Sequence, residues 1–353
     1  MKKSIIIAVL LFLSVLLFAQ YEPWLWARQA GEETSDYGYS VSVDSNGNSY
    51  VFGYFKGIIN YGNITIISRG YTDIFVAKID SNGSLQWIKQ AGGGGESSCA
   101  FSQSIVVTSS GIYITGVFLG TATFGSTTLN NNGYYDIFVA KLDSNGNWLW
   151  AKQAGGTDID ISYGIAVDSN GNSYITGNFF SSSITFGSTQ ITNCHLGTND
   201  IFVAKLNSYG NWLWAKQIGG IDFDSGNGIA VDSSNNIYIT GGFSSASISF
   251  GNITITNTNS GETDIFVAKL DSYGNWVAAT QAGGTDIDSS ESIAVDSSGN
   301  SYITGSFFSN SITFGSITLT NSGRDDIFVA KLDSNVTWSW ANKAGGNGYD
   351  DAT

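Results

Sequence analysis

A 21-residue segment, DIFVAKLDSNGNWLWAKQAGG, occupies residues 136–156, and close copies of it begin at four other aspartates. The steps between successive copies are 63, 64, 64 and 62 residues. The five copies begin at Asp73, Asp136, Asp200, Asp264 and Asp326. A fixed period of this length is typical of proteins built by stacking one supersecondary unit. The period therefore restricts the fold to a repeat architecture.

Each unit contains four segments with the patterns of β-strands. A short apolar segment leads through a DSNGN-type turn, which suits a hairpin, into an alternating strand such as NSYITGNF. The third is the unbroken apolar run DIFVAK, and a second such turn leads to the fourth, WLWAKQAGG. The first strands are predicted at Ser40–Asp44, Ser104–Thr108, Ile165–Asp168, Ile229–Asp232 and Ile293–Asp296.

The connector between the second and third strands varies most among the units. Its Thr, Ile and Phe content predicts a small extra hairpin, centred in one unit on Gly187 and Ser188. No part of the mature chain shows a 3.6-residue apolar period, so we expect no substantial helix.

Four antiparallel strands per unit, buried on both faces, describe a β-propeller, in which blades stack around an axis. We predict an all-β propeller over residues 20–353, with about five blades and with the first strand of each blade innermost. The Trp pairs of the fourth strand (148/150, 212/214, 338/340) lie at i and i+2, on one face, and are expected to pack on the neighbouring blade. The predicted units are about 24–91, 92–154, 155–218, 219–282 and 283–345, with the start of a further unit at 346–353.

Two stretches, GIAVDSNGNSYITG from Gly164 and DIFVAKLNSYGNWLWAKQIGG from Asp200, resemble the bacterial SBBP-type β-propeller repeat. The resemblance covers about residues 24–353 and recurs five times in register. It implies a propeller of exported bacterial proteins, often one module of a larger surface protein. It implies no single activity and no shared catalytic residue.

The blade number is open at the sequence level. Trp24–Ala30 copies the fourth strand without the first three, and Gly346–Thr353 looks like the loop into a further first strand. A fragment of a six- or seven-bladed ring, five blades with a spare strand, and an open arc all fit this pattern. We favour five blades of a chain that lacks its end, since an unclosed ring exposes edge strands.

The first 19 residues have the form of a secretory signal, with Lys2 and Lys3 before an apolar run and Ala19 at the expected cleavage site. A retained N-terminal anchor is the alternative. We therefore expect an exported protein, located outside the cell, on its surface or in the periplasm. Cys99 and Cys194 do not recur in the repeat, and free thiols are expected although export permits a disulfide.

The net charge of −14 disfavours nucleic acid as a partner. Spaced acids recur in the loop before the first strand of each unit. The aspartates that begin each third strand are expected on the same face of the propeller. Together the two sets would surround the channel mouth with negative charge. Ca²⁺ binding is one interpretation, and capping of loop N–H groups by Asp is the other. The candidate ligand-binding residues are Asp158, Asp160, Asp222, Asp224, Asp286 and Asp288.

Enzyme signatures are sparse. The single histidine, His195, lies in a variable connector, so a triad or a multi-His metal site would depend on it. A glycosidase needs two carboxyl groups in different environments, which leaves the non-repeated Glu96, Glu262 and Glu291 as the asymmetric acids. The DSNGN turn lacks the sixth-position Gly and the distal Glu of a calcium loop.

These patterns predict a non-catalytic, secreted propeller that serves as a binding or structural module for an unknown protein or glycan, with no cofactor. A glycosidase-like enzyme acting through acids of the loop face is the first alternative. A calcium-stabilised adhesion scaffold is the second.

Overall fold

The computed structural model describes residues 26, 27, 29, 31, 35–61 and 64–350 of the chain. These residues form thirty strands and no helix, so none of them belongs to a helix that could cross a membrane. The predicted signal segment, Met1–Ala19, lies outside the described residues.

The large strands form five blades, each with four antiparallel strands that we call a, b, c and d in chain order. Blade 1 contains β1 (Asp36–Val43), β2 (Ser49–Phe55), β5 (Gly70–Ile79) and β6 (Leu85–Ala91). Blade 2 contains β7 (Gly95–Thr108), β8 (Gly111–Leu119), β11 (Asp136–Leu142) and β12 (Trp148–Ala154). Blade 3 contains β13 (Asp160–Val167), β14 (Ser173–Phe179), β17 (Asp200–Leu206) and β18 (Trp212–Ile218). Blade 4 contains β19 (Asp224–Val231), β20 (Ile237–Phe243), β23 (Asp264–Leu270) and β24 (Trp276–Gly283). Blade 5 contains β25 (Asp288–Val295), β26 (Ser301–Phe307), β29 (Asp326–Leu332) and β30 (Trp338–Ala344).

An outer hairpin follows strand b in every blade, as the connector pattern predicted. The five outer hairpins are β3/β4 (Ile58–Tyr61, Ile64–Ile67), β9/β10 (Thr121–Phe124, Thr127–Asn130), β15/β16 (Ser183–Phe186, Thr189–Thr192), β21/β22 (Ser247–Phe250, Ile253–Thr256) and β27/β28 (Ser311–Phe314, Ile317–Thr320). The end of strand d pairs with the outer hairpin of the following blade, as Gly155 does with Thr185. The hairpins therefore connect neighbouring blades at the periphery.

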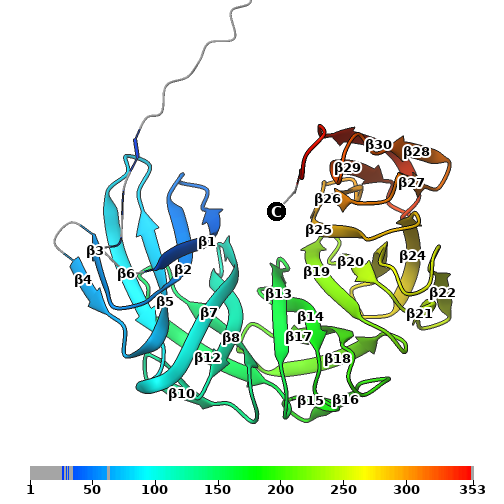
Figure 1. Ribbon diagram of the computed structural model, residues 1–353. Coiled ribbons are helices and arrows are strands. Elements are labelled where there is room, and N and C mark those ends of the chain that lie inside the picture. Colours follow the sequence, from blue (N-terminus) through cyan, green and yellow to red (C-terminus); the bar gives the residue numbers. More distant parts are fainter. Residues whose placement is uncertain (1–25, 28, 30, 32–34, 62–63, 351–353) are drawn as a thin grey trace, which may run out of the picture.

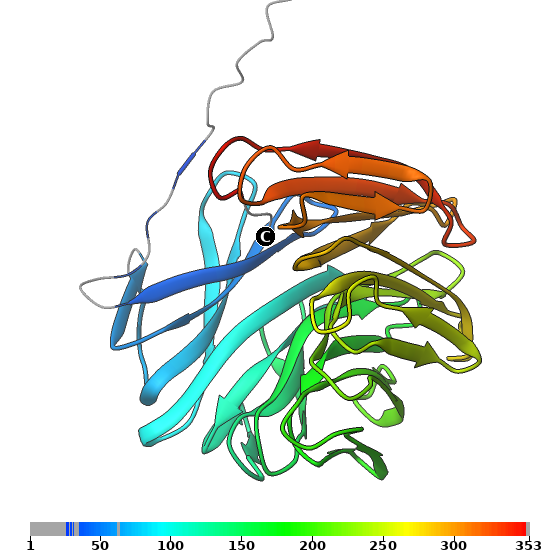
Figure 2. The ribbon, with the colours of Figure 1, turned by 45° about the vertical axis from the view of Figure 1, so that its right-hand side comes forward.

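The blades follow one another in chain order around an arc, with the a strands nearest the middle and the outer hairpins outside (Figure 1). The view turned by 45° shows the same succession of sheets, from blue to red (Figure 2). The predicted all-β propeller of four-stranded blades, with strand a innermost, is confirmed. All seven residues of β11 are buried, because the core of a propeller covers both faces of its c strands.

Strand a begins earlier than the sequence predicted. β13 starts at Asp160 rather than Ile165, and the other a strands are extended in the same way. The early residues mix acidic, small and apolar side chains, as in Asp160, Ile161 and Ser162, so they lack the continuous apolar pattern of the core strands. They are held by tertiary contacts instead: the Asp160 N–H donates to the Tyr135 carbonyl of the preceding blade at 2.9 Å.

The two tryptophans of strand d have different partners. The Trp150 indole N–H donates to the Ser208 carbonyl in the next blade at 3.2 Å, as the packing prediction required. Trp148 instead packs on Phe124 of its own outer hairpin, with ring centroids 5.2 Å apart. Both rings are half-buried, whereas Trp340, at the open end of the arc, is 37% exposed.

The two ends of the arc expose apolar side chains that are buried elsewhere. Val41 of blade 1 is 63% exposed, while Ile165 at the same position of blade 3 is 4% exposed. Trp26 donates to the Ser81 carbonyl of blade 1 at 3.2 Å, just as Trp87 donates to Ser144 of blade 2. Trp26 therefore lies where a blade preceding blade 1 would present its strand d.

Candidate binding site at the inner rim

A β-bulge recurs at one position of every a strand. The bulged residue has no register partner on strand b, and the register shifts across it, for example between Ser162 and Gly164. Bulges redirect side chains and are common beside functional sites. The residues directly before and after the bulge are Gly or Ser in every blade, yet the five bulged residues all differ except for two tyrosines. These bulge residues are Tyr39, Gln103, Tyr163, Asn227 and Glu291.

The environment of one bulge residue involves two others. Burial raises the pKa of the Tyr163 phenol, a side-chain hydrogen bond with Asn178 lowers it, and the charges of Tyr39 and Glu291 raise it further. These three bulge residues belong to blades 1, 3 and 5, whose a strands lie nearest the middle of the arc (Figure 1). Tyr39 is 57% exposed.

A row of five aromatic rings crosses blades 1 and 2 beside the bulges. Tyr37 stacks on Tyr54 at 4.9 Å between centroids, and Tyr54 meets Phe101 of blade 2 edge-on at 5.0 Å. Phe101 contacts Tyr135 at 6.1 Å, and Tyr135 contacts Tyr134 at 4.8 Å. We call these five rings the aromatic row. Its two ends, Tyr37 and Tyr134, are 51% and 50% exposed.

A chain of hydrogen bonds crosses blades 3 to 5 at the same height. Asn178 Nδ2 donates to Ser225 Oγ at 3.2 Å, and Ser225 Oγ donates to Asn227 Oδ1 at 2.9 Å. Asn227 Nδ2 reaches Ser289 Oγ at 3.5 Å, and Ser289 Oγ donates to Glu291 Oε1 at 2.8 Å. We call these five residues the polar chain.

Three rings of the aromatic row, Tyr37, Tyr54 and Phe101, occupy strand positions equivalent to those of the polar chain, whereas Tyr134 and Tyr135 lie in the connector before β11. Tyr37 pairs with Tyr54 in blade 1 as Ser225 pairs with Gly242 in blade 4. The position of Tyr54 in blade 1 is that of Asn178 in blade 3. One layer of the propeller is thus aromatic on one side and polar on the other. Together with the bulge residues we call this layer the inner rim.

The predicted loop acids divide into two groups. Asp158 accepts a hydrogen bond from the N–H of Ile159, and Asp222 and Asp286 do the same with their own following residues. Asp160 is buried and accepts hydrogen bonds from the Gly156 N–H at 2.7 Å and from Ser181 Oγ at 2.9 Å. Asp224 and Asp288 are buried in the same way, beside Ser245 and Ser309. These contacts are those expected of capping residues, and ligand binding by the six acids stays a prediction.

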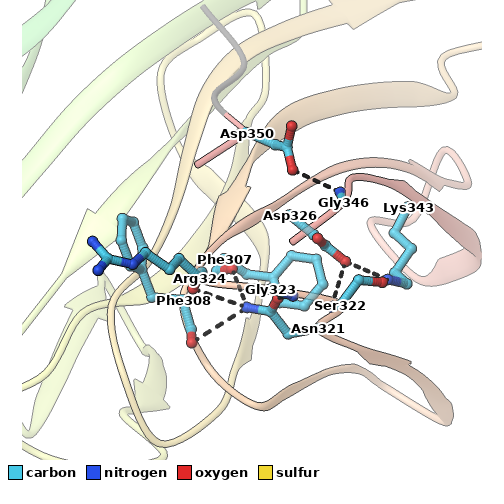
Figure 3. Close-up of polar contacts among 10 residues, drawn as sticks. All are labelled: Phe307, Phe308, Asn321, Ser322, Gly323, Arg324, Asp326, Lys343, Gly346 and Asp350. Atoms are coloured by element: carbon cyan, nitrogen blue, oxygen red, sulfur yellow. Dashed lines mark hydrogen bonds and ion pairs between the residues drawn. The ribbon is translucent and has the colours of Figure 1, made fainter. Parts of the chain in front are cut away.

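The acids that begin the c strands do not form an exposed negative ring, contrary to our expectation. Asp136 is fully buried, and burial raises its pKa to about 6. Burial likewise raises the pKa of Asp160 to about 7, with a further contribution from the charge of Asp136. In blade 5, Asp326 accepts from the Ser322 N–H and pairs with Lys343, and nearby the Gly346 N–H donates to Asp350 (Figure 3).

The DSNGN turns use their aspartates internally. Asp168 Oδ1 accepts from the N–H groups of Asn170 and Asn172, both at 2.9 Å, and Oδ2 accepts from the Asn172 amide and the Tyr174 hydroxyl. A hairpin therefore accounts for the resemblance to a calcium loop. Within the described ranges, no cluster of three or more His, Cys, Asp or Glu side chains is arranged to hold a metal ion.

The remaining sequence candidates lie apart from the inner rim, with one exception. The His195 N–H donates to Asn193 in the exposed connector of blade 3, and both cysteines are free, as expected. Of the three non-repeated glutamates, Glu291 is a member of the rim. Sequence reasoning missed the aromatic row and the polar chain. Comparing the five units position by position would have shown that these positions vary, but not that their side chains contact one another.

A family model described as a beta-propeller repeat, SBBP, matches residues 25–54, 149–178, 213–241 and 279–306. The chain carries SBBP β-propeller repeats. Each match in the middle of the chain runs from strand d of one blade through strands a and b of the next. The matched ranges pass over the corresponding part of blade 2, where a shorter turn, TSSG, replaces DSNGN.

Two curated proteins are similar in sequence to part of this chain. An uncharacterized WD repeat-containing protein of Acanthamoeba polyphaga mimivirus is 30% identical over 51% of the chain, and the regulatory protein FlaEY of Caulobacter vibrioides is 28% identical over 35%. The matches span only 15% and 13% of those proteins' own lengths.

Two solved structures resemble the chain weakly. They are a catalytically inactive virginiamycin B lyase from Staphylococcus aureus with quinupristin and a structure described as NanB with optactamide. The lyase is 11% identical with a TM-score of 0.32, covering 86% of this chain and 96% of its own. NanB is 10% identical with a TM-score of 0.33, covering 89% and 48%. Similarity at this level carries no argument about activity.

Proposed function

We propose that the protein is an exported, non-catalytic binding module whose ligand contacts the inner rim of the propeller. The observation that carries this proposal is that the bulge residues differ from blade to blade, whereas the c strands and the DSNGN-type turns are nearly constant. Residues that only build a blade are needed in every blade, and they recur. Side chains that differ from blade to blade at one redirected position, on the strands nearest the middle of the arc, are those expected of a binding surface.

The chemistry of the rim supports binding without catalysis. Glycoside hydrolysis requires two carboxyl groups in distinct environments. Glu291 is the only acid among the five bulge residues, and its Oε1 accepts a hydrogen bond from Ser289. Export is supported by the signal-like Met1–Ala19 segment.

The test is a calorimetric screen of the full chain against a soluble β-glucan, a mannan, alginate and a casein digest. We expect one probe to bind, to lose affinity on Tyr39→Ala, and to be recovered unaltered. Tyr209→Ala is the matched control, because Tyr209 is 79% exposed in a c–d turn on the opposite face. Binding that Tyr39→Ala leaves unchanged, or no binding across the panel, overturns the rim as the site. Products released from any probe overturn the non-catalytic role.

A further inference from the structure

We propose that the inner rim binds a neutral polysaccharide chain, with sugar rings stacked on the aromatic row and hydroxyl groups bonded to the polar chain. This inference rests on the proposed function, since it names the class of ligand for the same site. The aromatic row and the polar chain each support this choice of ligand.

The aromatic row offers flat apolar surface that is fixed before a ligand arrives. Tyr54 and Phe101 are half-buried and lock the row across the junction of blades 1 and 2, while Tyr37 and Tyr134 present about half of their surface to solvent. Tyrosine combines large rigid contact area with a hydroxyl group and loses little conformational entropy on binding. The carbon-bound hydrogens on one face of a sugar ring are a partner of matching shape and polarity.

The polar chain offers groups that suit the hydroxyl edges of the same ligand. The hydroxyl hydrogens of Ser225 and Ser289 are donated within the polar chain, to Asn227 and Glu291, so their oxygens are left to accept hydrogen bonds from sugar hydroxyl groups. Glu291, when ionised, only accepts, so it selects a hydroxyl donor. Asn227 Nδ2 donates to Ser289 Oγ and to the Ser290 carbonyl, from blade 4 to blade 5. These bonds fix the orientation of the Asn227 and Ser289 side chains.

Charge and backbone geometry restrict the ligand further. A net charge of −14 and a carboxylate on the rim repel anionic polysaccharides, which leaves neutral ones. A peptide that binds by adding a strand would need a continuous strand edge to pair with. The bulge in each a strand interrupts the strand geometry at the height of the rim, for example at Tyr163. The rim therefore favours a ligand bound through side chains.

The test extends the same screen with variants of each half of the rim. We expect the β-glucan or the mannan to bind with an affinity that does not change between 0.1 and 0.5 M NaCl, ionic strengths at which the screening of charges differs strongly. Tyr37→Ala and Tyr134→Ala should each weaken binding by about 2- to 10-fold. Glu291→Gln should weaken it by about tenfold or more. Tyr209→Ala and Tyr273→Ala, in turns of the opposite face, should leave it unchanged; circular dichroism confirms that each variant is folded.

The outcomes separate the inference from the proposed function. If the casein digest or alginate binds in a Tyr39-dependent way and both neutral polysaccharides are inert, the rim is a binding site but the ligand class is wrong. If a neutral polysaccharide binds but neither Tyr37→Ala nor Tyr134→Ala weakens it, the aromatic row is not the platform and this inference fails. If no probe depends on Tyr39, both proposals fail.

Discussion

The ammonium nitrogen of Lys205 lies 4.8 Å from the centroid of the Tyr174 ring, and the Tyr174 hydroxyl donates to Asp168 at 3.0 Å. The same lysine–tyrosine pair is present in all five blades, with distances from 4.7 to 5.3 Å. Within the described part of the chain the structure has one salt bridge, between Lys343 and Asp326, so the lysines mainly contact aromatic rings.

This contact predicts a measurable coupling between the two side chains. Lys205→Met removes the cation, Tyr174→Leu removes the ring, and the double variant completes a cycle. We expect a coupling of about 0.5–2 kcal/mol in the free energy of unfolding, because the pair is partly desolvated. Urea denaturation of the four proteins measures it. A coupling near zero would show that the recurrent geometry adds no stability.

Much of the fold was predictable because its signals are local. The turn at Asp168 contains both the aspartate and the N–H groups that its carboxylate accepts, so the hairpin follows from five consecutive residues. The apolar run of β11 likewise specifies a strand buried on both faces. Both patterns occur five times at a nearly constant spacing, and the described residues form five blades.

The inner rim was not predictable because its contacts join distant parts of the chain. Tyr54 and Phe101 are 47 residues apart, in different blades, and no local pattern links them. The early residues of strand a have no continuous apolar pattern, so Asp160 looked like part of a loop. Its position as the first residue of β13 depends on a hydrogen bond to Tyr135 of the preceding blade.

Gly155→Ala is expected to destabilise the protein strongly. A Cβ atom at Gly155 would lie 2.1–2.3 Å from the carboxyl atoms of Asp136, which is buried and unable to move away. We expect a loss of about 2 kcal/mol or more, as for other overpacked sites. Thermal unfolding followed by circular dichroism measures the loss.

Gly94→Ala provides the control for that substitution. A Cβ atom at Gly94 would meet nothing within 4 Å. Its effect should stay within about 1 kcal/mol, since only the conformational freedom of the unfolded chain changes. Equal losses for the two variants would contradict the proposed contact between Gly155 and Asp136.

Trp150→Phe is expected to weaken the junction between blades 2 and 3. The substitution removes the indole N–H that donates to the Ser208 carbonyl and leaves that carbonyl without this donor. The expected cost is about 1–3 kcal/mol. Trp340→Phe serves as the comparison, because Trp340 lies at the open end of the arc and is 37% exposed. Trp340→Phe should lower the free energy of unfolding by less than half as much as Trp150→Phe. A larger loss for Trp340→Phe would contradict an inter-blade contact made by the second tryptophan of strand d.

The buried acids at the blade junctions predict that the protein loses stability as the pH rises from about 4 to neutrality. The folded pKa values of Asp136 and Asp160 are about 6 and about 7, whereas the usual value is 3.8. The folded protein therefore binds more protons than the unfolded chain between these values. Because the free energy of unfolding follows the difference in bound protons, the contribution of these two acids is complete below pH 3.8 and is lost as the pH rises through 6 to 7. The turn aspartates act oppositely, since hydrogen bonds lower the pKa of Asp143, so their contribution is lost in acid.

The unfolding midpoint is accordingly expected to be highest at about pH 4–6 and to fall by several degrees toward pH 8. Asp160→Asn should flatten this fall, because the amide keeps an acceptor for the Gly156 N–H but cannot ionise. Asp158→Asn, two residues earlier on the exposed loop, should leave the slope unchanged. A midpoint that rises from pH 5 to pH 8, or a slope that Asp160→Asn does not alter, would contradict the protonation of these carboxyl groups in the folded protein.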